Sequence, residues 1–169
     1  MATVNVAYAA QAALTVTAWT TTLAAGEFAT SAIYDNTSNL YVDVLLGGGL
    51  ATAGTSAAAG ETMDVYIVPI YNTVTDTDAQ GAIGAALGAG GEEAEDVAFV
   101  KANMKLLESV NLEVTAPTTA QTYHWGTKSV VAALGHMPPR FMLMLHNNTG
   151  AAMAAGCDVN TIGVTYTSA

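Results

Sequence analysis

The stretch "RFMLMLHNNTGAAM", residues 140–153, contains apolar side chains that do not alternate with polar ones. One face of a β-strand here would carry Phe141, Leu143 and Leu145. Met142 and Met144 make the opposite face apolar as well, where a half-buried strand should be polar. The sequence therefore predicts a strand over 140–146 with both faces shielded from water.

Most of the remaining chain has a period of two. In "ETMDVYIVPIY" (61–71), Met63, Val65 and Ile67 share one face, and "SVNLEVT" (109–115) alternates in the same way. Turn-forming clusters separate further runs of this kind. These other predicted strands cover 14–23, 28–34, 40–46, 122–133 and 161–167. About eight short strands without a βαβ rhythm predict one all-β domain over 1–169, an antiparallel β-sandwich of the jelly-roll type.

Three stretches do not fit the strand pattern. Residues 78–97, "DAQGAIGAALGAGGEEAEDV", contain too much Gly for a stable helix and predict one long Gly/Ala-rich loop. Residues 99–109 have mixed apolar spacing and are interpreted as holding a single helical turn. "GGGL" (47–50) lacks the Lys and Ser/Thr of a phosphate loop, so it is interpreted as a strand end that needs glycine conformations.

The charge of the chain is strongly acidic and unevenly distributed. The sequence has 14 Asp and Glu, 4 Lys and Arg, and a formal net charge of −10. Eleven of the acids precede the first basic residue, Lys101. Because nucleic acid and anionic membranes repel such a chain, neither is an expected partner.

The sequence also indicates where the protein folds. No apolar run approaches the roughly 20 residues that span a bilayer. The opening "MATVNVAYAAQAALTV" lacks a basic n-region, so we expect no signal peptide. A single cysteine, Cys157, excludes an internal disulfide and is typical of a reducing cytoplasm.

No motif predicts catalysis, a metal site or a cofactor. His124, His136 and His146 lack zinc-ligand spacing, and no G-x-S-x-G elbow is present. "DTDAQG" (76–81) begins like a calcium loop, but Leu87 stands where the bidentate Glu belongs, which leaves an acidic hairpin tip or a low-affinity ion site. We therefore expect no enzyme.

Glycan binding is an alternative function for a sandwich of this kind. It requires exposed aromatic platforms, and Trp19 and Trp125 lie in Thr-flanked predicted strands where they could face outward. This alternative predicts a glycan-binding module of a phage appendage or a cell surface.

Nearly the whole chain resembles a family of small structural proteins of tailed bacteriophages that decorate or cement the capsid. The similarity lies in the order and spacing of five segments. They are "MAT…YAAQAALTVT", "SAIYDNTSNLYVDVLL", "ETMDVYIVPIY" with the Gly-rich loop after it, "AFVKANMKLLESVNLEV" and "MPPRFMLMLHNNTGAAM…IGVTYTS". Residues 79–91 and the doubled methionine of 140–146 depart from the more polar versions expected of the family.

The resemblance implies a virion protein, a β-sandwich subunit of a symmetric shell with no active site. The acidic charge predicts that it binds the outer capsid surface, and the expected lack of a signal peptide predicts that it is made in the host cytoplasm. Its implied partners are the major capsid protein and other copies of itself, in a homotrimer. Such a contact would cover the second face of 140–146, with Met137, Met142, Met144 and His146 at the interface. The alternative is that 140–146 is a central strand with both faces inside one domain.

Overall fold

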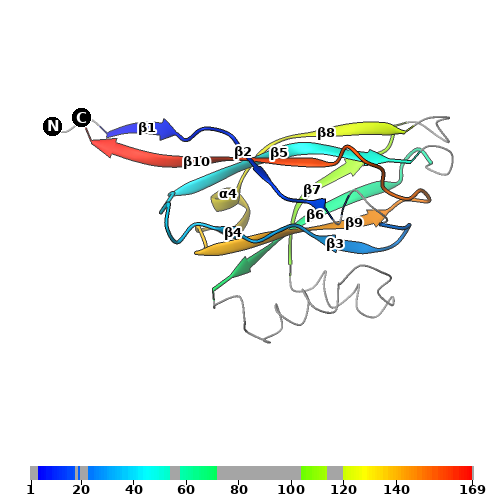
Figure 1. Cartoon of the computed structure of the whole chain (residues 1–169), viewed down its shortest axis with the longest axis horizontal. Coiled ribbons are helices and arrows are strands. Elements are labelled where there is room, and N and C mark those ends of the chain that lie inside the picture. The colour runs from blue at the N-terminus through cyan, green and yellow to red at the C-terminus, as the bar shows by residue number, and fades with distance from the viewer. Residues whose placement is uncertain are drawn as a thin grey trace.

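Two antiparallel β-sheets pack face to face in the computed structural model of the chain (Figure 1). The structure describes residues 4–17, 19, 23–53, 58–71, 104–113 and 120–168. Its elements are β1 (Val4–Tyr8), β2 (Ala12–Leu14), β3 (Phe28–Thr30), β4 (Tyr34–Asp35), β5 (Asp43–Thr52), β6 (Thr62–Ile70), β7 (Lys105–Asn111), β8 (Gln121–Ser129), α4 (Val130–Leu134), β9 (Arg140–Asn148) and β10 (Asp158–Ser168). The long loop predicted over 78–97 lies outside the described residues.

The strand order is that of a jelly roll. Sheet A has the order β1-β10-β5-β8, with β2 also paired to β10, and sheet B has the order β3-β9-β6-β7, with β4 also paired to β9. The first strands thus pair with the last, and each later pair lies further inside the sequence, as in one long hairpin rolled up. The predicted all-β sandwich is confirmed. Ten strands occupy eight positions, because β1 and β2 share one place beside β10 and β3 and β4 share one beside β9.

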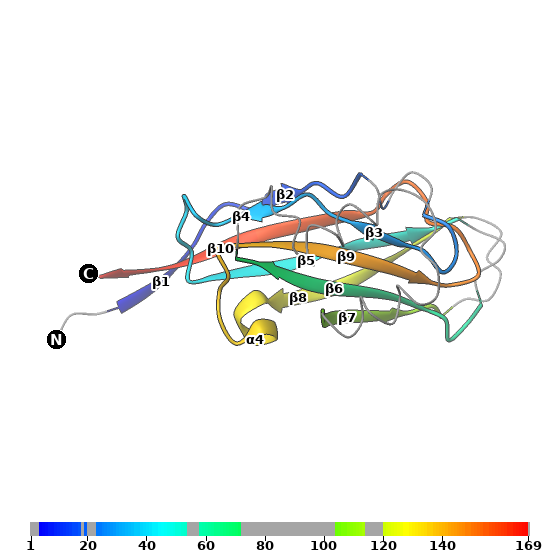
Figure 2. The ribbon, with the colours of Figure 1, turned by 90° about the horizontal axis from the view of Figure 1, so that it is seen from below.

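The main core lies between the two sheets, which Figure 2 shows as two layers. Its fully buried side chains include those of Val44, Leu46, Leu50, Met63, Val65, Ile67, Phe141, Leu143 and Leu145. The sequence correctly predicts the shared faces of 63, 65 and 67 and of 141, 143 and 145. Full burial of each such side chain contributes roughly 1.5–3 kcal/mol, so this layer dominates the stability of the sandwich.

The N-terminal segment differs from the prediction. Of the described residues in the strand expected over 14–23, namely 14–17, 19 and 23, only Leu14 lies in a strand, and Thr17 and Trp19 have helical backbone. The turn places the Trp19 indole in the core, fully buried, where its Nε1 donates to the Ala29 carbonyl at 3.0 Å. The Thr-rich alternation wrongly predicts a strand here, because burial of the large Trp19 side chain stabilises the turn more than strand propensity stabilises a strand. Strand β1 was not predicted.

Two further elements are assigned wrongly from sequence. Residues 105–109, expected to hold a helical turn, belong to β7, where Glu108 pairs with Val65 of β6. The strand expected over 122–133 ends at Ser129, and α4 follows. Ser129 caps the helix by accepting from the Ala132 N–H, and Gly135 ends it with φ 82°. These cap residues are readable in the sequence, but β-branched "VV" favoured a strand.

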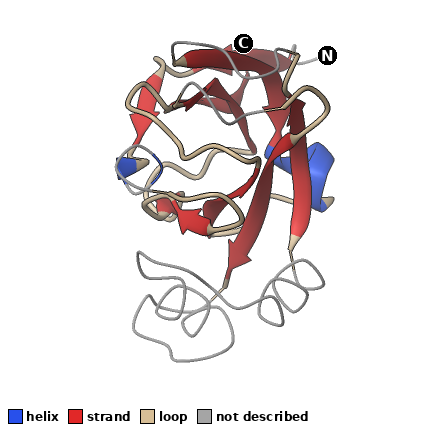
Figure 3. Cartoon of the chain, turned by 90° about the vertical axis from the view of Figure 1, so that its right-hand side faces the viewer, coloured by secondary structure: helices blue, strands red, loops and turns tan. Residues whose placement is uncertain are grey.

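Helix α4 flanks one side of the sandwich, as the view along the long axis shows (Figure 3). Within the described residues, no helix has the length and apolar character needed to cross a membrane.

Candidate functional site

The residues predicted to form a subunit contact are mostly buried within a single chain. Met142 and Met144 are 5% and 0% exposed, His146 is 4% exposed, and Met137 is partly buried against the main core. A second apolar cluster lies on the face of sheet B that points away from the main core. It consists of Phe28, Tyr66, Val68, Ile70, Met142 and Met144, with Ile33 and Met104 packed against it.

Strand β9 therefore has two dry faces. His146 continues the second cluster, because its ring stacks on Phe28 at 4.3 Å between centroids and its Nδ1 lies 3.8 Å from a carboxylate oxygen of Asp64. This burial agrees with the alternative of a central strand inside one domain. A subunit contact through Met142 and Met144 stays a prediction. Both side chains are buried within one chain, so they do not offer an exposed surface to a second copy.

Neither tryptophan is an exposed aromatic platform. Trp19 is 0% exposed and Trp125 is 6% exposed, and both belong to the main core. The expectation that they face outward is wrong, because both side chains pack between the sheets. A glycan cannot stack on either ring in this structure.

The single thiol is also part of the packed interior. Cys157 is 8% exposed and its Sγ accepts from the Ala51 N–H at 3.2 Å. Burial raises the pKa of the Cys157 thiol, so the reactive thiolate is disfavoured at neutral pH. Among the described residues, no group of three or more His, Cys, Asp or Glu is placed to hold a metal ion. The acidic segments at 76–81 and 90–96 lie outside these residues.

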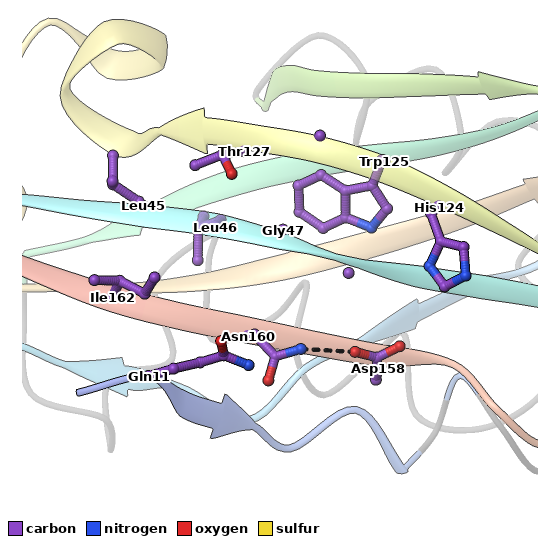
Figure 4. A pocket seen from close by; sticks show the side chains of 12 residues that line it. Gln11, Leu45, Leu46, Gly47, His124, Trp125, Thr127, Asp158, Asn160 and Ile162 are labelled. Carbon is purple, nitrogen blue, oxygen red and sulfur yellow. Dashed lines mark hydrogen bonds between the residues drawn. The ribbon is translucent and has the colours of Figure 1, made fainter.

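A groove of about 340 Å³ lies on sheet A, where β5, β8 and β10 run side by side (Figure 4). Its polar side chains come from Gln11, His124, Thr127, Asp158 and Asn160, and its apolar ones include Leu45, Ile162 and the edge of Trp125, which is only 6% exposed. The amide of Asn160 donates to the Asp158 carboxylate at 2.7 Å. This set of carboxylate, amide and imidazole groups can hydrogen-bond a small polar molecule, although the volume is near the lower limit for ligand pockets.

Glycines line this groove, and at Gly48 a side chain would not fit. Residues 47–50 lie inside β5 and not at a strand end, and Gly47, Gly48 and Gly49 have no positive φ, so the interpretation as a strand end that needs glycine conformations is wrong. A Cβ on Gly48 would lie 2.0 Å from the Asp158 carbonyl oxygen. The register between β5 and β8 also shifts between Leu46 and Gly48. Close approach of a neighbouring strand, rather than backbone conformation, therefore requires glycine at position 48, whereas a Cβ on Gly47 would come no closer than 3.7 Å to another residue.

Strand β1 and residues 164–168 of β10 form a two-stranded arm that extends beyond the rest of the sandwich (Figure 2). In the pairing register, Tyr8 is opposite Val164, Val6 opposite Tyr166 and Val4 opposite Ser168. Partners opposite one another point to the same face of a sheet, and alternate residues point to the other. We call the face that carries Val4, Val6, Tyr8 and Tyr166 the arm face.

The arm face is apolar and exposed. Val4 is 66% exposed, Val6 52%, Tyr8 65% and Tyr166 63%. The opposite face of the arm carries Asn5, Ala7, Thr165 and Thr167. Residues 4–8 are not among those predicted from sequence to form a strand or a contact, although the alternation of "VNVAY" (4–8) is a strand signal. The arm thus has the alternating pattern of a strand pair with one buried face, but no other described residue covers its apolar face.

The comparisons with known proteins provide little. No family model matches the sequence, and no curated protein matches it. Among solved structures, a chain of Desmodium yellow mottle tymovirus is similar, with 13% identity, a TM-score of 0.32, and coverage of 100% of this chain and 89% of that chain. A similarity this weak carries no argument about function.

Proposed function

We propose that the chain is a structural virion protein that decorates the outside of a tailed-phage capsid and stabilises the shell without catalysis. The observation that carries this proposal is the exposed, uncharged arm face at one end of an otherwise strongly acidic jelly roll. Exposed apolar patches rimmed by polar surface mark protein interaction sites. Jelly rolls serve as capsid and lectin domains, and the resemblance in sequence to capsid-decorating proteins favours the first of these roles.

The charge of the chain supports an outer position. Packaged DNA presents phosphate to the shell interior, and a subunit of net charge −10 cannot neutralise it. We propose the major capsid protein as the partner on the shell and other copies of this chain as further partners, in a homotrimer as expected from the sequence. Many weak contacts repeated over a lattice suffice for stable attachment.

Purified, DNA-filled heads provide the test. Mass spectrometry should find the protein at a fixed ratio to the major capsid protein. An Ala155→Cys variant should then be labelled on intact heads by an impermeant biotin-maleimide, because Ala155 is exposed in the turn before β10. The parent chain is the matched control, since its one thiol, Cys157, is buried. Absence from the heads, or labelling only after they are opened, would refute the proposal.

The groove favours glycan binding as a second candidate. Its carboxylate and amide groups are those that hydrogen-bond sugar hydroxyls, but neither tryptophan provides a stacking surface. Retention on polysaccharide columns that is lost in an Asp158→Ala variant would support this candidate over capsid decoration.

A further inference from the structure

We propose that a second copy of this chain docks on the arm face. The inference rests on the assembly role proposed above and names a surface through which copies meet in pairs. This contact is separate from those of the proposed homotrimer, because a face packed on its own copy joins two chains and not three. Among the described strands, β1 pairs with β10 and with no other. An isolated two-stranded β-ribbon is marginally stable in water, so an arm with an apolar side gains most from a partner that covers that side.

The charge distribution favours a second copy as the occupant. Two copies of a chain with net charge −10 repel each other over most of their surfaces. Residues 4–12 and 159–168, which supply the arm and the strand segments that lead into it, contain no charged residue. The arm face is therefore a place where two copies can meet without apposing like charges, and it offers no charge that would select a charged partner.

The acidic residue nearest to the arm in the strand pairing is already engaged. Asp43 of β5 pairs with Val164 of β10 at the base of the arm. Its carboxylate accepts from the Ser129 hydroxyl at 2.6 Å and from the Val131 N–H at 3.0 Å. These two donors turn the carboxylate toward β8 and α4, so it does not oppose a partner on the arm face.

The arm face also fits a copy of itself in shape. Tyr8 stands on β1 beside Val164, whereas Tyr166 stands on β10 beside Val6. Large and small side chains thus alternate diagonally across the ribbon. When such a face packs against its own copy, the tyrosines of one can lie over the exposed Val4 and Val6 of the other, whereas Val164 is already buried. Tyrosine is also enriched in protein interfaces because its ring packs and its hydroxyl stays hydrated.

The size of the face predicts a weak contact. With each large side chain supplying about 150–250 Å² when fully exposed, the four residues present roughly 400–500 Å² per copy. A standard stable interface buries about 800 Å² per partner. We therefore expect association that depends on concentration in the micromolar range, which a lattice of many copies would strengthen.

Analytical ultracentrifugation of the full chain, from about 1 µM to about 100 µM, tests this inference. The wild type should gain mass as concentration rises. A Val6→Glu/Tyr166→Glu variant should need at least tenfold more protein to do so. The matched control is Asn5→Glu/Thr167→Glu, which adds the same charge to the adjacent pair on the opposite face of the same strands, and it should associate like the wild type. Circular dichroism of both variants establishes that the sandwich is intact.

A wild type that stays monomeric throughout would overturn the inference, as would an equal loss of association in the control. The same samples separate this inference from the proposed function. If the wild type is monomeric yet co-purifies with heads, the capsid role stands and self-docking falls. If the Val6→Glu/Tyr166→Glu variant is monomeric and still binds heads, the self-contact stands and shell attachment uses another surface.

Discussion

A Gly48→Ala substitution should be far more damaging than its single added methyl group suggests. Gly48 lies in β5, paired with Val159 of β10. The added Cβ would lie 2.0 Å from the Asp158 carbonyl oxygen, 3.0 Å from its carbonyl carbon and 3.1 Å from the Val159 Cα. All three are backbone atoms of a strand in the middle of sheet A. No side chain can rotate away, so the two strands must separate.

The cost follows from that geometry. Carbon and oxygen atoms ordinarily approach to about 3.3–3.6 Å, so the strands would have to move apart by more than about 1 Å at this point. Overpacking of this kind costs about 1–3 kcal/mol and occasionally more, and the lower backbone entropy of Ala offsets about 0.5–1 kcal/mol. Because the clash is with backbone at 2.0 Å, the upper end of that range applies, and we expect a net loss of about 2–2.5 kcal/mol and a fall in Tm of roughly 4–10 °C for a chain of this size.

Urea unfolding followed by fluorescence measures this loss, because Trp19 and Trp125 are both buried and report on the core. Gly126→Ala is the matched control, since Gly126 borders the same groove and its added Cβ would meet no atom within 4 Å. That variant should be as stable as the wild type or slightly more stable. Equal stability of the Gly48→Ala variant and the wild type would refute the argument from strand approach, as would equal damage in both variants.

Three further outcomes are expected. Asn147→Leu should cost roughly 2–3 kcal/mol in urea unfolding, because the buried Asn147 side chain donates to three backbone carbonyls, each of which would keep one other donor, and accepts from the Thr149 hydroxyl. Changing Met142 and Met144 to Glu should abolish the folded state in circular dichroism, since both are buried; a folded variant of lower mass would instead support a subunit contact. Hydrogen bonds from Thr37, with help from Arg140, lower the pKa of Asp35 to about 2, so its stabilising effect is complete above its unfolded pKa of about 4 and is lost as pH falls toward 2. In Asp35→Asn, the Tm should therefore change less over that pH range, and an unchanged profile would contradict this assignment.

The sequence predicts the jelly roll because apolar residues alternate most regularly in the strands that form the core, β6 and β9. The faces of β6 and β9 that meet in the core are readable from alternation alone. Sequence cannot show what covers the second face of β9, because the covering residues are distant in the chain. Phe28 and Tyr66 reach Met144 only through the pairing of β3 and β6 with β9.

The candidate sites are harder to predict than the fold. Glycan binding was predicted at the tryptophans because aromatic side chains often stack on sugars. In the structure, a helical turn places Trp19 in the core, and Trp125 lies on the inward face of β8. The arm face was missed for the opposite reason, because Val4, Val6 and Tyr8 look like ordinary strand residues. Only the structure shows that they extend past the second sheet, so their exposure depends on the relative lengths of the strands and not on their own pattern.

The place of β10 in the middle of sheet A has a consequence for how the protein is made. Strand β5 has β10 on one side, and β1 and β2 depend on β10 as well. About a hundred residues separate the end of β5 at Thr52 from the start of β10 at Asp158. At a synthesis rate of about 5–20 residues per second, the ribosome needs roughly 5–20 s to add them. Throughout that interval sheet A lacks its central strand, so the sandwich can close only after translation has reached the C-terminal strand, and β5 must avoid aggregation with other nascent chains until then.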